Sequence, residues 1–233
     1  MNVKTWTTAA MAAAALACLP ATASAVGISA GGLTTSTGSY SDTGAEAVNL
    51  TDVDGTKDDA TAFLLLEIAG NADFNAFGIY AFTDTGSSIT LGDKLQVFAG
   101  AADAPTSARI SFNVADGKAW LGSGAQPSDA KNIGTTFGFY LEGPNGTFYS
   151  HSALNGGANQ ALIFDVSADD SGELNGSNVV VAFEDTLNGD RDFNDLVVGV
   201  NDVAAVPEPG SMLLLGTGLF GVAGAARRRF GIR

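Results

Sequence analysis

The sequence predicts an all-β protein, an antiparallel β-sandwich with a jelly-roll-like strand order. Apolar runs of four to eight residues recur along the chain, and this is the usual length of a strand. Gly, Asn and Asp separate the runs, and Asn-Gly or Asp-Gly pairs mark the turns. Between residues 26 and 210 no stretch has the 3.6-residue apolar repeat of a helix, so we do not expect parallel βαβ units.

Nine of these runs are expected to be strands. They are Ala62–Ala69, Phe77–Thr83, Lys94–Phe98, Arg109–Val114, Thr136–Leu141, Thr147–Ser150, Ala161–Val166, Val179–Phe183 and Leu196–Val200. Residues 26–50 are rich in Gly, Ser and Thr, and are expected to form a flexible arm or an edge strand. Residues 51–205 should then make up one β-sandwich domain.

Residues 1–25 have the features of a secretory signal peptide. Lys4 supplies the positive charge, Ala9–Leu19 the short apolar stretch, and Ala23-Ser24-Ala25 the small-residue site after which signal peptidase cleaves. Eleven apolar residues are too few to span a bilayer, which disfavours a membrane anchor. A lipoprotein signal ending at Cys18 is also disfavoured, because the preceding Leu stands one position too late.

The C-terminal segment, residues 206–233, has three distinct parts. Pro207-Glu208-Pro209 is expected to be extended and accessible, because two prolines prevent helical hydrogen bonding. Residues 210–226 are apolar and about 25 Å long as a helix, which predicts a short transmembrane helix. Arg227 to Arg229 should remain cytoplasmic by the positive-inside rule.

This order of Pro-Glu-Pro, apolar helix and arginine cluster resembles the PEP-CTERM sorting signal of Gram-negative bacteria. The resemblance implies cleavage by an exosortase near Pro207–Pro209, after export across the inner membrane and a transient anchoring there. It implies a final place at the cell surface or in the extracellular matrix or biofilm, in a bacterium that makes exopolysaccharide. The alternative is a plain C-terminal membrane anchor.

The charge of the chain excludes one class of partner. Its pI is near 4.1 and its net charge is −14, whereas nucleic-acid binding needs clustered Lys and Arg. Without both end segments, residues 26–206 keep six cations against twenty-four carboxylates, a net charge near −18, and no Cys. Such self-repulsion destabilises a compact fold, and bound cations would relieve it. Solubility alone would explain a diffuse negative charge equally well.

The strongest local feature is the segment Val179 to Val200, in which two β-branched runs flank an acidic loop. The loop holds five carboxylates and one amide, which are Glu184, Asp185, Asp190, Asp192, Asn194 and Asp195. Oxygen-only ligands suit a hard cation such as Ca²⁺, which takes six to eight of them. The flanking strands and the misplaced later residues exclude an EF-hand, so we expect a Ca²⁺ loop in a hairpin. The alternative is a solvated acidic loop held by Asx turns and Arg191.

Two further acidic features are less specific. A second candidate metal site, of its own or completing the first, consists of Asp52, Asp54, Asp58 and Asp59. An ordinary acidic turn is an equal alternative. Glu67 lies inside an apolar strand and therefore needs a partner, either Arg109 or Arg191, backbone groups, or a metal.

Parts of residues 60–203 resemble the bacterial domain-of-unknown-function 4114 family. The most specific part is the run Gly-Asp-Arg-Asp-Phe-Asn-Asp-Leu-Val at 189–197, supported by Phe183-Glu184-Asp185 and Phe137-Gly138-Phe139-Tyr140. The resemblance implies a secreted β domain with no established activity. It places the family's signature acids on the same loop residues without giving them a role.

The sequence does not predict an enzyme. His151 is the only His and is expected at the surface beside a turn, with no Gly-x-Ser-x-Gly elbow to form a catalytic triad. Zinc is nearly excluded, because His and Cys ligands are lacking. Glu184 and Asp185 are adjacent on a strand and should face opposite ways, which suits a glycosidase poorly. Trp120, with Tyr140, Phe148 and Tyr149, would stack on sugars if exposed, although core packing is favoured.

We therefore expect a non-enzymatic, Ca²⁺-stabilised β domain with a structural or adhesive role linked to exopolysaccharide. The main alternative is a carbohydrate-binding module that uses Trp120 and Tyr149. A secreted glycoside hydrolase is the least favoured reading.

Overall fold

The structure is a computed structural model that describes residues 27–29, 32–51, 58–66, 71–102, 104–187 and 189–206. In chain order its elements are β1 (Gly27–Ser29), β2 (Gly32–Thr34), β3 (Ser39–Tyr40), β4 (Val48–Leu50), β5 (Asp58–Leu66), η1 (Ala72–Phe74), β6 (Ala76–Asp84), β7 (Ile89–Phe98), β8 (Thr106–Asn113), β9 (Lys118–Leu121), β10 (Lys131–Asn132), β11 (Thr136–Gly143), β12 (Gly146–Tyr149), η2 (Ser152–Asn155), β13 (Ala161–Asp165), β14 (Val179–Phe183), β15 (Leu196–Val200) and β16 (Val203–Ala205).

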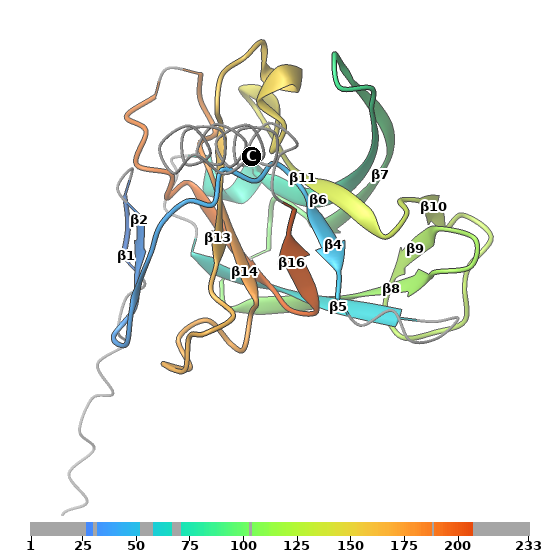
Figure 1. Cartoon of the computed structure of the whole chain (residues 1–233), viewed down its shortest axis with the longest axis horizontal. Coiled ribbons are helices and arrows are strands. Elements are labelled where there is room, and N and C mark those ends of the chain that lie inside the picture. Colours follow the sequence, from blue (N-terminus) through green and yellow to red (C-terminus); the bar gives the residue numbers. More distant parts are fainter. Residues whose placement is uncertain are drawn as a thin grey trace, which may run out of the picture.

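Most strands belong to two large sheets (Figure 1). The seven-stranded sheet has the order β10-β9-β8-β5-β15-β14-β13, and the six-stranded sheet has the order β16-β4-β11-β6-β7, with β12 paired to β11. The pairings within both sheets are antiparallel. The predicted all-β, antiparallel class is confirmed, whereas the jelly-roll-like order stays a prediction.

The helical segments of the described residues are η1 and η2, each a single short 3-10 turn. Within these residues no helix is long and apolar enough to cross a membrane. The predicted signal helix at 1–25 and transmembrane helix at 210–226 both lie outside the described residues.

The main apolar core lies between the two large sheets. From the six-stranded sheet, alternate residues point inward, such as Phe77 and Ile79 of β6 and Phe139 of β11. Phe183 of β14 reaches across from the other sheet, with its ring edge-on to Phe77 at a centroid distance of 6.4 Å. The ring of Phe77 also stacks on Phe139 at 5.8 Å. The two sheets are therefore in direct contact through aromatic rings.

A second apolar cluster covers the opposite face of β13 and β14. Leu162, Phe164 and Val180 of these strands pack there, together with Leu33 of β2. Leu33 belongs to the small antiparallel sheet β1-β2-β3, which lies beside β13 at the left of Figure 1, and its side chain is completely buried. Both faces of β14 are thus covered, which explains why its sequence is a continuous apolar run rather than an alternating one.

Residues 26–50, expected to be an arm or edge strand, contribute β1–β3 of the small sheet and β4 of the six-stranded sheet. The small sheet is held to the domain by polar contacts as well. The hydroxyls of Thr35 and Tyr40 donate hydrogen bonds to Asp169 Oδ2, at 2.7 and 2.9 Å. Burial raises the pKa of Asp169, but hydrogen bonds from Ser171, Thr35 and Tyr40 outweigh this effect and lower the pKa to about 2.

Two glycines allow tyrosine rings to lie across neighbouring strands. In the β6–β11 ladder Gly138 pairs with Tyr80, and Gly78 pairs with Tyr140. A Cβ on Gly138 would collide with the Tyr80 ring, and one on Gly78 would meet the Tyr140 ring at 2.5 Å. Each ring therefore fills the space that a side chain on the partner strand would need.

The nine expected strands correspond to β5, β6, β7, β8, β11, β12, β13, β14 and β15. Val179–Phe183 and Leu196–Val200 have the predicted bounds, and the other seven differ by a few residues at one or both ends. Strands β1–β4 lie in the segment expected to be an arm or an edge strand, and the short strands β9, β10 and β16 were not predicted. Most of them are polar or Gly-rich, so their sequences lack the apolar runs that revealed the others.

Candidate metal centre

The β14–β15 hairpin positions the acidic loop. Phe183 and Leu196 form the last residue pair of the ladder, so Glu184 begins the loop and Asp195 ends it at neighbouring positions. The backbone N–H of Asp185 donates to Asp195 Oδ2 at 2.8 Å, and this bond holds the two ends of the loop together. The predicted hairpin with an acidic loop is therefore confirmed.

The loop folds back over its own first residue. Arg191 and Phe193 adopt left-handed backbone conformations, with φ of 61° and 56°, which are uncommon for residues other than glycine. The Phe193 N–H donates to Glu184 Oε1 at 2.8 Å, and its ring is buried in the second apolar cluster. A Cβ on Gly189 would lie 2.6 Å from Glu184 Oε2, so a larger residue there would displace the Glu184 carboxylate. Packing of Phe193 therefore holds the loop against the Glu184 carboxylate.

Three carboxylates converge as a result. One oxygen from each of Glu184, Asp190 and Asp192 lies within 4.8 Å of the other two. Glu184 is 2% exposed, Asp192 is half-buried and Asp190 is exposed, so the three carboxylates extend from the interior to the surface. Within the described parts of the chain, the ion pairs are Lys94–Glu142 and Arg109–Asp59, so none of these residues forms an ion pair with the three acids.

Two other predicted residues, Asn194 and Asp195, lie beside this group. The Asn194 side-chain amide donates to Asp192 Oδ2, and its backbone N–H approaches Asp192 Oδ1 at 3.4 Å, which orients that carboxylate. Burial raises the pKa of Asp195 to about 6, and the negative charges of Asp185, Glu184 and Asp192 add to this effect. The N–H of Asp185 opposes the rise.

Asp185 faces away from the three carboxylates. Its Oδ2 accepts hydrogen bonds from the side-chain amides of Asn71 and Asn75, at 3.1 and 3.0 Å, and its Oδ1 accepts one from Thr186. The amide of Asn145 donates to the Asp185 carbonyl at 3.2 Å. Asp185 is therefore a buried anchor that ties the start of the loop to the η1 segment and to the β11–β12 turn. Sequence reasoning missed these asparagines, because nothing in their spacing points to the loop.

The three converging oxygens are hard ligands and provide about half of a Ca²⁺ coordination shell. Backbone carbonyls or water would have to supply the rest. The arrangement does not suit glycoside hydrolysis, because the carboxyl pair of a glycosidase must reach a sugar and Glu184 is almost fully buried.

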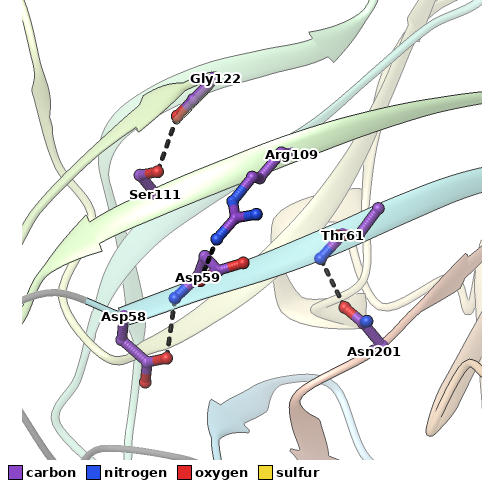
Figure 2. Close-up of polar contacts among 7 residues, drawn as sticks. All are labelled: Asp58, Asp59, Thr61, Arg109, Ser111, Gly122 and Asn201. Atoms are coloured by element: carbon purple, nitrogen blue, oxygen red, sulfur yellow. Dashed lines mark hydrogen bonds and ion pairs between the residues drawn. The ribbon is translucent and has the colours of Figure 1, made fainter. Parts of the chain in front are cut away.

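The second acidic cluster is arranged differently (Figure 2). Asp52 and Asp54 lie outside the described residues, and so does Glu67. Asp59 on β5 forms an ion pair of 2.6 Å with Arg109 on β8, and Asp58 Oδ1 accepts the N–H of Asp59 at 2.7 Å. Neither residue belongs to the converging acids found among the described residues.

Other contacts in Figure 2 join the strands around this pair. The Thr61 N–H donates to the side-chain oxygen of Asn201 at 2.5 Å, and the Ser111 hydroxyl donates to the Gly122 carbonyl at 2.7 Å. The first bond ties β5 to the β15–β16 turn, and the second ties β8 to the end of β9. Asp58 and Asp59 therefore lie in a sheet whose strands are joined by side-chain hydrogen bonds and an ion pair.

The expectation that His151 lies at the surface is wrong, because its side chain is 5% exposed. The Tyr80 oxygen accepts the His151 backbone N–H at 3.2 Å, and the same hydroxyl forms a hydrogen bond of 2.5 Å with His151 Nδ1. The ring also packs on Phe82 at a centroid distance of 4.3 Å. Burial lowers the pKa of His151, and the position of the ring is that of a core residue.

The tryptophan predicted to favour the core does lie there, with Trp120 5% exposed. Tyr149 is half-buried, and its ring packs edge-on against Tyr80 at 5.2 Å. The two residues therefore form no exposed aromatic platform for a sugar.

Comparison with protein families identifies two segments of the chain. Residues 205–229 match the PEP-CTERM protein-sorting motif, and residues 125–202 match the domain of unknown function DUF4114. Both predicted resemblances are confirmed, the second over a shorter span than 60–203. No curated protein and no solved structure matches the chain. The sorting motif points to export, to sorting toward the cell envelope or surface, and to recognition by an exosortase-type protease.

Proposed function

We propose that this exported protein is a non-enzymatic β domain whose β14–β15 loop binds Ca²⁺, with a structural or adhesive role at the cell surface or in an exopolysaccharide matrix. The single observation that carries the proposal is the convergence of Glu184, Asp190 and Asp192 within 4.8 Å, with Glu184 almost fully buried. A buried carboxylate beside two like charges is unfavourable unless a cation neutralises it.

The organisation of the loop supports the same proposal. Its turn depends on two left-handed residues and on a glycine that admits the Glu184 side chain, and these features direct the three oxygens to one point. A merely solvated acidic loop needs none of them, because its carboxylates would spread apart in water. The net charge near −18 of residues 26–206 gives bound cations a second, longer-range stabilising effect.

The expected affinity is weak, as in extracellular modules. A dissociation constant on the order of 10⁻⁴–10⁻³ M leaves the site saturated by about 10 mM Ca²⁺. Under those conditions binding stabilises the fold by about 1.4–2.7 kcal/mol, which for a domain of this size raises the melting temperature by about 3–10 °C.

The test is a thermal melt of the processed chain in EDTA and in millimolar Ca²⁺. We expect a higher melting temperature in Ca²⁺, and we expect Asp190→Asn and Asp192→Asn each to remove most of the shift. Asp59→Asn is the matched control, because Asp59 is paired with Arg109 away from the loop and should leave the shift intact. Equal melting temperatures with and without the ion would refute Ca²⁺ binding at this site.

A further inference from the structure

A pocket of about 280 Å³ lies where β9 and β10 of the seven-stranded sheet meet β7 of the six-stranded sheet. Its walls are largely apolar, and two charged side chains lie at its rim. The lining includes Trp120, Leu121, Asp129 and Lys131. In Figure 1, β8, β9 and β10 occupy the right-hand end of the molecule, opposite the small sheet β1-β2.

Hydrogen bonds beside the pocket link β10 of one large sheet to β7 of the other. The backbone N–H and the side-chain amide of Asn132 on β10 both donate to Asp93 Oδ2 on β7, at 2.9 Å each. The Lys118 ammonium on β9 donates to the Asn132 side-chain oxygen at 3.1 Å. These bonds hold the Lys131–Asn132 strand in place without a ligand, so the pocket is already formed in the free protein.

The lining combines an apolar floor with separated charges. Trp120 is 5% exposed and forms part of the floor, whereas Leu121 is 45% exposed and forms an accessible wall. Asp129 and Lys131 are both exposed and form no ion pair with each other among the described residues. The pocket therefore offers a carboxylate and an ammonium at different points above one apolar surface.

The ammonium of Lys131 is available to a ligand. Three other cations of the described chain have partners: Lys94 pairs with Glu142, Arg109 pairs with Asp59, and Lys118 binds Asn132. The Lys131 ammonium forms no ion pair and no side-chain hydrogen bond among the described residues, although its positive charge helps to lower the pKa of Asp93. An ammonium beside a preformed apolar pocket favours an anionic ligand that also has an apolar face.

We propose that this pocket binds one uronic-acid unit of an acidic saccharide chain. The sugar carboxylate pairs with Lys131, ring hydroxyls donate to Asp129, and the C–H face of the ring lies against Leu121. The rim is open at Leu121, Asp129 and Lys131, so the polymer continues on both sides of the bound unit. This site lies apart from the candidate metal centre, and the proposal does not depend on Ca²⁺.

Fluorescence gives a local readout, because Trp120 is the only tryptophan left after the signal peptide carrying Trp6 is removed. The experiment titrates the processed chain with tetragalacturonate in EDTA, and with the neutral cellotetraose as the comparison ligand. Calorimetry in parallel detects binding that leaves the fluorescence unchanged. We expect saturable binding of the uronate oligomer and at least about tenfold weaker binding of the neutral one.

Two variants remove the same charge at different places. Lys131→Gln should weaken uronate binding by about 10–100-fold, the loss typical of one charge-assisted hydrogen bond. Arg109→Gln, on β8 and paired with Asp59, should bind as the wild type does.

The proposal is overturned if the uronate does not bind at millimolar concentration, if both saccharides bind equally, or if Lys131→Gln binds as tightly as the wild type. Since EDTA is present throughout, none of these outcomes bears on Ca²⁺ binding by the loop.

Discussion

Replacing Glu184 by Gln should stabilise the ion-free protein and abolish its stabilisation by Ca²⁺. The Glu184 oxygen lies within 4.8 Å of a carboxylate oxygen of Asp190 and of Asp192. Two unit charges at that distance repel by about 0.9 kcal/mol in water and by about 3.5 kcal/mol at an effective dielectric constant of 20. Because Asp190 is exposed and Asp192 half-buried, solvent screens both pairs and the lower values apply.

The two repulsions together should come to about 2 kcal/mol, which for a domain of this size is about 4–8 °C in melting temperature. Gln keeps the shape of the side chain and an oxygen that accepts the Phe193 N–H, so packing is preserved. The variant should therefore melt above the wild type in EDTA, and its melting temperature should no longer respond to Ca²⁺.

The assay is a thermal melt of both proteins in EDTA and in millimolar Ca²⁺. Glu142→Gln is the control, because it removes the same charge from an exposed pair with Lys94 and should change stability by less than about 1 kcal/mol. The reasoning is refuted if Glu184→Gln melts well below the wild type in EDTA, or if it keeps the full Ca²⁺ shift.

Three further predictions concern pH, backbone space and surface charge. Burial lowers the pKa of His151 below 6.5, so on acidification the unfolded chain takes up the His151 proton before the folded one does. Urea titrations should therefore show the free energy of unfolding decreasing as the pH falls from about 7 to 5, and His151→Gln should lack this decrease. Burial raises the pKa of Asp195 to about 6, so on acidification the folded state takes up the Asp195 proton before the unfolded one does. In EDTA, the contribution of the protonated Asp195 to the free energy of unfolding should decrease as the pH rises from about 4 to 6. Asp195→Asn should remove this second component, and an unchanged profile in either variant would contradict the assignment. Gly189→Ala should lose the Ca²⁺ shift in melting experiments, since its Cβ would meet Glu184 Oε2 at 2.6 Å, and a normal shift would show that the loop need not close on Glu184. Arg109→Ala should change the free energy of unfolding by no more than about 1 kcal/mol, because its ion pair is half-exposed; a larger loss in urea unfolding would assign it a core role.

The strands that sequence reasoning located best are those buried on both faces. Val179–Phe183 and Leu196–Val200 have the expected bounds, because covered strands require unbroken apolar runs. Lys118–Leu121 was missed, since it is short and begins with a lysine, although Ala119 and Trp120 are buried. Such strands are stabilised by their neighbours rather than by their own sequence, so a local pattern does not reveal them.

The acidic loop could be recognised from its composition, but composition did not indicate which three of its carboxylates converge. That selection depends on left-handed backbone at Arg191 and Phe193, and neither residue type predicts it. Asp185 was grouped with the ligands, yet it is held by amides 110 and 114 residues away along the chain. Contacts over that sequence distance follow from the strand order, which the sequence pattern alone left open.

Calorimetric titration of the processed chain with CaCl₂ tests the central claim most directly. We predict saturable binding of one ion by each chain, with an affinity on the order of 10⁻⁴–10⁻³ M, that is lost in Asp192→Asn and retained in Asp59→Asn. Absence of binding heat at several temperatures, or equal binding by both variants, would contradict a Ca²⁺ site formed by Glu184, Asp190 and Asp192.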